Sequence, residues 1–352
     1  MSAGAEKRGM KLRMLLPLAI AGVLLLALTR CHVETEAHTQ IEAMNTLVSL
    51  DLYGRDASGA MEEAVDRIYS LEHSFTATSG SPIFDLNNAG GDWSPLDEDS
   101  TVLLGEALQL AALTDGAMDP TAYPAVKAWG FTVGRERIPT QKELDKLVKL
   151  IDYRKVELDE ENRRARMPKG MALDLGAVAK GYAGDQLAAQ LKDQGVRSAL
   201  LSLGASSIQT VGSKTDGSPW RIGVQDPQGN GTICVVEMSD RAMGTSGGYQ
   251  RFFERDGVRY WHIMDPETAS PARSGLLSVS IVADSGLLCD ALSTALFVMG
   301  EEKGADLWRA HPELEFDVIF IREDGSLAIT AGLEDSFSLT SAYQDREVTL
   351  LK

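Results

Sequence analysis

Residues 287–299 read LLCDALSTALFVM and end at Gly300. Every position in this stretch is apolar except Asp290, Ser293 and Thr294, so it predicts a helix that is buried on nearly all sides. A single carboxylate in such a helix is costly unless it is paired or binds a metal ion. The stretch therefore predicts both the core of the fold and a partner for Asp290.

Asp290 and Thr294 are four residues apart, so their oxygens should project from one helix face, one turn apart. Two hard oxygen donors on one face suit Mg²⁺, which takes few protein ligands and keeps water or phosphate oxygens for the rest. An alternative of equal weight is that Asp290 is an acid near the helix N-terminus and Thr294 bonds its own backbone.

Around this helix the chain predicts an α+β fold. Helices are expected at residues 58–71, 102–113, 141–151, 177–192, 287–299 and 302–310. Strands are expected at residues 46–53, 155–158, 164–167, 172–175, 199–203, 220–224, 233–237, 250–254, 258–263, 277–282, 318–322 and 327–330. Runs of strands with inserted helices, rather than strict βαβ alternation, indicate mixed sheets with no sequential domains.

A second carboxylate, Asp174, lies at the expected end of a strand and just before a helix. Gly176 and Ala177 leave the backbone approachable there, and the N–H groups of a new helix can hold an anion. Lys180, one turn into the helix, could reach a phosphate or a ribose. The simpler alternative is a strand–turn–helix in which Asp174 is only a cap.

Three further segments could carry chemistry. His262 lies at the end of an expected hairpin, and imidazole is the natural proton acceptor near neutral pH, although the pattern by itself favours a structural histidine on a strand. Residues 114–120 form a glycine-led turn that would admit a flat ring or a ribose. Residues 243–249 read as a hydroxyl-rich loop that could bind phosphate or could merely turn.

Composition restricts the classes of function. The chain has 352 residues, and 34 Lys and Arg against 51 Asp and Glu give a formal net charge of −17. An acidic surface argues against binding a nucleic-acid backbone. Cys289 falls within the apolar helix pattern, which favours a buried free thiol over a disulfide with Cys234.

The N-terminus predicts export. Basic residues precede an apolar run over residues 14–28, which resembles a signal segment and is short for a membrane-spanning helix. Cys31 could carry a lipid, although Arg30 stands where lipoprotein signals have a small residue, so an uncleaved anchor is the alternative. We therefore expect a retention segment over residues 1–31, a polar tether over residues 32–43 and a location on the extracytoplasmic face of the cell membrane.

Five motifs follow one another along the chain: AMDP at 117–120, DLGAVAKGY at 174–182, TSG at 245–247, HIMDP at 262–266 and DALSTAL at 290–296. In this order they resemble the ApbE family of FAD:protein FMN transferases, and the resemblance covers about residues 42–332. It implies one α+β domain over residues 44–340, related to tunnelling folds.

The resemblance also implies an activity. Members bind FAD with Mg²⁺, cleave its pyrophosphate and attach FMN to a Thr or Ser hydroxyl of an acceptor protein, releasing AMP. The implied metal ligands are Asp290, Thr294 and the carbonyl of Ala177, with Ser293 beside them. The implied FAD contacts are Met44, Ala117, Met118, Asp119, Asp174, Lys180 and Met264. We interpret His262 as the base for the acceptor hydroxyl, with Asp290 and the metal as alternative activators.

We expect the acceptor to be a membrane redox subunit with an exported domain. Two other functions stay open: a Mg²⁺-dependent FAD pyrophosphatase that releases FMN and AMP, and a non-catalytic FAD-binding lipoprotein. The sequence also departs from the family pattern. Ala77 or Thr78 stands where many relatives have an aromatic residue, and Phe75 is the candidate substitute. Asn45, Ala205 and Ala269 stand where glycine is frequent.

Overall fold

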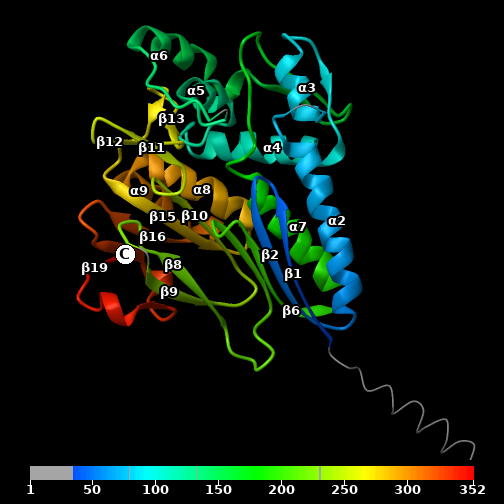
Figure 1. Cartoon of the computed structure of the whole chain (residues 1–352), viewed down its shortest axis with the longest axis vertical. Helices are drawn as coiled ribbons and strands as arrows, with labels where there is room; N and C mark the ends of the chain where they lie inside the picture. Colours follow the sequence, from blue (N-terminus) through cyan, green and yellow to red (C-terminus); the bar gives the residue numbers. More distant parts are fainter. Residues whose placement is uncertain (1–34, 79, 133, 230) are drawn as a thin grey trace, which may run out of the picture.

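The computed structural model describes residues 35–352 except residues 79, 133 and 230, and its centre is a nine-stranded sheet (Figure 1). Neighbouring strands are antiparallel except β17 and β19, which run parallel. The strands, in spatial order, are β1 (Thr35–Ala43), β2 (Thr46–Gly54), β6 (Val196–Leu203), β7 (Ser207–Val211), β10 (Ala242–Gly247), β15 (Leu276–Ala283), β16 (Asp317–Arg322), β17 (Leu327–Thr330) and β19 (Val348–Leu351).

Four helices cover one face of this sheet: α2 (Ala57–Phe75), α7 (Ala179–Asp193), α8 (Gly286–Met299) and α9 (Glu301–Ala310). The main core lies between these helices and the sheet, and its largest fully buried side chains include Phe297 of α8 and Phe320 of β16. This arrangement confirms the predicted buried helix over residues 287–299 and the α+β class.

A smaller sheet covers the opposite face. Its strands are β8 (Trp220–Gln225), β9 (Thr232–Met238) and β18 (Phe337–Leu339). A second apolar cluster fills the space between the sheets and includes Ile222, Val236, Met243 and Val282. The central strands β15 and β16 are thus covered on both sides, which explains why they read as nearly continuous apolar runs.

The remaining elements gather at one end of the molecule, beyond the edge of α7 and α8 (Figure 1). They are α3 (Pro82–Asn88), α4 (Glu98–Leu113), α5 (Tyr123–Trp129), α6 (Gln141–Leu147), β3 (Ser94–Pro95), β4 (Glu157–Asp159), β5 (Arg164–Arg166), β11 (Phe252–Arg255), β12 (Val258–Trp261), β13 (Met264–Asp265) and β14 (Ser270–Pro271). Short 3₁₀ turns lie at Pro120–Ala122, Val148–Leu150, Tyr153–Lys155, Pro312–Leu314, Ala331–Leu333 and Ser341–Tyr343.

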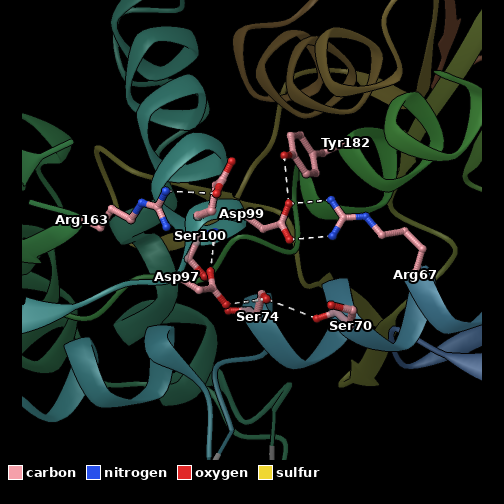
Figure 2. A network of polar contacts seen from close by, with 9 residues as sticks. Arg67, Ser70, Ser74, Asp97, Asp99, Ser100, Arg163 and Tyr182 are labelled. Atoms are coloured by element: carbon pink, nitrogen blue, oxygen red, sulfur yellow. Dashed lines mark hydrogen bonds and ion pairs between the residues drawn. The ribbon is translucent and has the colours of Figure 1, made fainter. Parts of the chain in front are cut away.

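A polar network fastens α2 to α4 (Figure 2). Two nitrogens of Arg67 donate to the two carboxylate oxygens of Asp99 at 2.7 and 2.6 Å. Asp97 accepts from the Ser100 N–H at the start of α4 and from the Ser74 hydroxyl at 2.6 Å. Asp97 is therefore a helix N-cap that also joins two helices.

The structure corrects the predicted ends of the domain. Residues 35–43 were predicted to be a polar tether, but they form β1, which pairs along its whole length with β2. The alternating exposure of β1 explains the error, because an edge strand with one solvated face carries many polar residues. At the other end the domain extends beyond residue 340, since β19 pairs with β17.

Two internal predictions were also wrong. Residues 243–249 were predicted to be a loop, but Ala242–Gly247 is the central strand β10. Residues 172–175 are not a strand: the amide side chain of Asn87 donates to the Leu173 carbonyl and accepts from its N–H, at 2.8 and 2.7 Å. A side chain there makes the hydrogen bonds that a neighbouring strand would have made.

Among the described residues, no helix has the length and apolar character needed to cross a membrane. The predicted retention segment, including Cys31, lies outside the described residues. Cys234 and Cys289 are buried free thiols, as predicted for Cys289.

Candidate active site

The N-terminal turn of α7 crosses the first turns of α8 at two glycines. A Cβ on Gly181 would lie 2.0 Å from the carbonyl oxygen of Gly286, so only glycine permits this approach. At the crossing the Gly181 N–H donates to Asp290 Oδ2 at 2.7 Å, and the Ser207 hydroxyl of β7 donates to Asp290 Oδ1 at 2.6 Å. The lone acid of α8 therefore has its partners on α7 and β7.

The structure does not show the alternative in which Asp290 is an acid at the helix N-terminus and Thr294 bonds its own backbone. Asp290 is the fifth residue of α8, beyond its first turn, and Ser285 caps that helix. The Thr294 hydroxyl shares a 3.1 Å hydrogen bond with Ser246 of β10, not with its own backbone. Ser246 also contacts Ser293 at 2.9 Å, so β10 brings a third hydroxyl to the face that carries Asp290.

The carbonyl of Ala177 is available for coordination. In a regular helix it would accept from the N–H of Gly181, but that N–H is directed to Asp290. Among the described residues, no backbone N–H donates to the Ala177 carbonyl. The same hydrogen bond thus joins α7 to the carboxylate and leaves the Ala177 carbonyl without its helical donor.

These donors fit Mg²⁺. Asp290 is 7% exposed, and burial raises the pKa of its carboxyl, although Lys180 and the Ser207 hydroxyl favour the charged form. A cation would relieve that cost. No group of three or more His, Cys, Asp or Glu side chains suited to a metal occurs in the described part of the chain. A site of one carboxylate, a hydroxyl and a carbonyl needs no such group, because Mg²⁺ keeps several waters or phosphate oxygens.

Lys180 and Asp174 lie on either side of the start of α7. Lys180 donates to the hydroxyl of Ser206, which follows β6. Asp174 accepts from the Gly176 N–H at 2.7 Å, and burial raises the pKa of its carboxyl. The Asp174 N–H donates to the Pro120 carbonyl at 3.0 Å, which brings the 117–120 motif to the same place.

Within that motif Asp119 is already engaged. It accepts from the N–H and hydroxyl of Thr121 and from the N–H of Tyr153, and burial raises its carboxyl pKa. Ala117 is half-buried, whereas the Met118 side chain is 2% exposed in the main core. Met118 is therefore a core residue, and its N–H donates to the Thr114 hydroxyl at 3.4 Å.

His262 follows β12, and its ring and backbone N–H both contact the carbonyl of Arg251. Burial, together with the nearby charges of Arg251 and Lys180, lowers the pKa of His262 to about 4, although the contact with the Arg251 carbonyl acts in the opposite direction. The imidazole is therefore neutral at pH 7 and can accept a proton. Arg251 also favours the charged form of Asp174, so it connects the two motifs. Sequence reasoning missed Arg251, which belongs to none of the five motifs.

The two remaining predicted FAD contacts, Met44 and Met264, lie on elements other than α7 and α8. Met44 occupies the turn between β1 and β2, where its N–H donates to Glu72 of α2 at 2.8 Å. Met264 of β13 is 5% exposed and packs in a separate apolar cluster with Trp129. Phe75 is 5% exposed and lies edge-on to Tyr182, so it does not present its ring to a ligand.

The departures from glycine have a backbone cost. Asn45, Ala205 and Ala269 all have positive φ, at 58°, 57° and 53°. Glycine adopts this conformation freely, whereas a residue with a Cβ is strained by about 1 kcal/mol. These three turns keep the left-handed shape without the residue that favours it.

Comparison with known proteins agrees with this arrangement. The model of the ApbE family matches residues 44–319. The chain belongs to the ApbE family. It is 33% identical to the FAD:protein FMN transferase of Treponema pallidum (strain Nichols) over 85% of this chain and 88% of that protein. It is 32% identical to that of Escherichia coli (strain K12), over 61% of this chain and 63% of that protein.

Solved ApbE structures share the fold. The ApbE protein of Thermotoga maritima superposes with a TM-score of 0.78 at 32% identity, covering 83% of this chain and 96% of that one. The apo form of the Pseudomonas stutzeri flavinyl transferase ApbE gives a TM-score of 0.73 at 28% identity, covering 87% of this chain and 94% of that one. The mixed sheets and inserted helices are thus those of the family.

Proposed function

We propose that this protein is a Mg²⁺-dependent FAD:protein FMN transferase, which moves the FMN part of FAD to a Thr or Ser hydroxyl of an acceptor protein. Family membership and the names of the relatives support the transferase activity. The observation that supports the metal is the crossing of α7 and α8, where the Gly181 N–H bonds Asp290 and leaves the Ala177 carbonyl without its helical donor.

Asp290, Thr294 and the Ala177 carbonyl would hold the ion, with Ser293 beside them. Bound Mg²⁺ would neutralise charge on the pyrophosphate oxygens as the bond to AMP breaks. Lys180 supplies a second positive charge close to Asp290. Asp174 and residues 117–119 would hold the rest of the dinucleotide, next to the start of α7.

His262 would take the proton of the acceptor hydroxyl. The hydroxyl oxygen forms a bond to the FMN phosphorus, the bond from that phosphorus to the AMP oxygen breaks, and AMP leaves as the anion. The ring is neutral at pH 7, because burial and Arg251 lower its pKa. A neutral imidazole has a ring nitrogen that can accept this proton.

The acceptor and location are proposed from the sequence. The basic and apolar residues before Cys31 support export with retention at the extracytoplasmic face of the membrane, by a signal anchor or a lipid on Cys31. An enzyme held there would meet acceptors with exported Thr or Ser residues, such as a membrane redox subunit.

The test is to incubate the protein with FAD, Mg²⁺ and a Thr-bearing acceptor peptide, with a Thr-to-Val peptide as control. A mass gain equal to FMN on the Thr peptide alone, with AMP released, supports the transferase. Release of AMP and free FMN without a peptide adduct would indicate a pyrophosphatase. If neither the adduct nor AMP forms, the protein would instead be a flavin-binding protein without turnover. Omitting Mg²⁺ should abolish the adduct.

A further inference from the structure

The start of α8 is held by a carboxylate from another helix. Asp185 of α7 accepts from three donors: the Ser285 hydroxyl at 2.9 Å, the Gly286 N–H at 2.6 Å and the Leu287 N–H at 3.0 Å. Ser285 in turn accepts from the Leu288 N–H at 3.2 Å. The first four N–H groups of a helix need such acceptors, and here two of them are satisfied by one side chain of α7.

Asp185 is one helical turn after Gly181, so both face α8. Gly181 bonds Asp290 in the second turn of α8, while Asp185 bonds the first residues of the same helix. Two attachment points one turn apart fix both the rotation of α8 and its position along its axis. The absent side chains at Gly181 and Gly286 allow the helices to approach closely enough for both attachments.

We propose that Asp185 is a positioning residue for the metal site. By anchoring the start of α8 to α7, it keeps Asp290 and Thr294 opposite the Ala177 carbonyl. The inference rests on the proposed role of these three groups as metal ligands. Asp185 itself is committed to the backbone and hydroxyl of residues 285–287, and it acts through α8 and not on the ion.

Asp97 provides a matched control. It is also an aspartate that caps one helix and bonds a second, and Figure 2 shows its contacts with Ser74 and Ser100. Its helices, α2 and α4, contribute none of the proposed metal ligands. Replacing either aspartate by Asn removes one capping acceptor, so both variants should lose thermal stability.

The experiment measures metal binding by the full chain without FAD, with Mn²⁺ as the probe followed by the EPR signal of the free ion, and with Mg²⁺ as competitor. Asp185→Asn should weaken Mn²⁺ binding by about 10-fold or more, as loss of supporting contacts around metal ligands does. Asp97→Asn should bind within about two-fold of the wild type. If Asp185→Asn does not fold, Ser285→Ala should still weaken binding measurably, because it removes one of the three donors to Asp185 together with the acceptor of the Leu288 N–H.

Wild-type Mn²⁺ affinity in a destabilised Asp185→Asn protein would overturn the inference, as would an equal loss in Asp97→Asn or the absence of Mn²⁺ binding by the wild type. Flavin transfer is assayed separately on the same samples. A wild type that binds Mn²⁺ in an Asp185-dependent manner but transfers no FMN would refute the proposed function and leave the positioning role intact.

Discussion

Replacing Asp290 by Asn separates the structural and chemical roles of this residue. An Asn side chain can keep both hydrogen bonds, with its oxygen accepting from the Gly181 N–H and its amide donating to the Ser207 hydroxyl. What it loses is the charge and the second oxygen. We therefore expect Asp290→Asn to fold normally and to lose its metal ion.

The effect on stability without metal follows from the pKa. Because burial raises the pKa of Asp290 in the folded protein, ionisation costs stability as pH rises from the unfolded pKa through the folded one. A neutral Asn avoids this cost. By comparison with other buried charges, the variant should gain about 2 kcal/mol at pH 7 in EDTA. That corresponds to a rise in Tm of roughly 4 °C.

With Mg²⁺ present, the wild type should become more stable than Asp290→Asn. At about 100 times its Kd, an ion that binds only the folded state adds about 2.7 kcal/mol to the wild type and nothing to the variant. Flavin transfer by the variant should fall by about 10³-fold or more, since the metal contributes several kcal/mol. Thermal unfolding with EDTA and with Mg²⁺, and transfer to a Thr peptide, measure both effects.

Asp317→Asn is the control, because Asp317 is another buried acid and its partners, Thr330 and Arg241, belong to neither α7 nor α8. Its response to Mg²⁺ should match the wild type. An Asp290→Asn protein that is less stable than the wild type in EDTA, or that is still stabilised by Mg²⁺, would refute the reasoning.

Three further predictions follow from single contacts. Since the pKa of His262 is lowered to about 4, the acidic limb of the pH profile of kcat/KM for transfer should lie near pH 4 and not near 6.5. Arg251→Gln should move this limb to higher pH. A wild-type limb near pH 6.5, or full activity of His262→Ala, would show that His262 is not the base. Gly181→Ala should destabilise the protein by about 3 kcal/mol in urea unfolding, because its Cβ would meet the Gly286 carbonyl. Gly105→Ala in α4 is the control: the nearest neighbours of its Cβ would lie at 3.5 Å, so it should be neutral or stabilising. Similar changes in stability for the two variants would contradict the close crossing of α7 and α8. Arg67→Met should lower the free energy of unfolding by about 2 kcal/mol, because it removes both hydrogen bonds to Asp99, and it should leave flavin transfer at 25 °C unchanged. A loss of transfer with unchanged stability would show that this network serves the active site instead.

The sequence was most informative where periodicity and composition agree. The apolar pattern of residues 287–299 gave α8 nearly to the residue, because a buried helix needs apolar side chains on almost every face. The same reasoning failed at β10, whose sequence Ala-Met-Gly-Thr-Ser-Gly is small and hydroxyl-rich. That strand lies directly under α8: a Cβ on Gly244 would lie 2.6 Å from the Cys289 backbone, so the strand is small because the helix is close.

The sequence by itself determined the family, the α+β class and the residues that can carry chemistry, since five ordered motifs and the cost of a buried acid are properties of the chain. Tertiary structure alone decided how those residues act together. No motif marks Ser207, Asp185 or Arg251, because their roles arise from contacts with residues far away in the chain. The decisive contact, from the Gly181 N–H to Asp290, joins residues separated by 109 positions, and it exists only because two glycines let α7 and α8 touch.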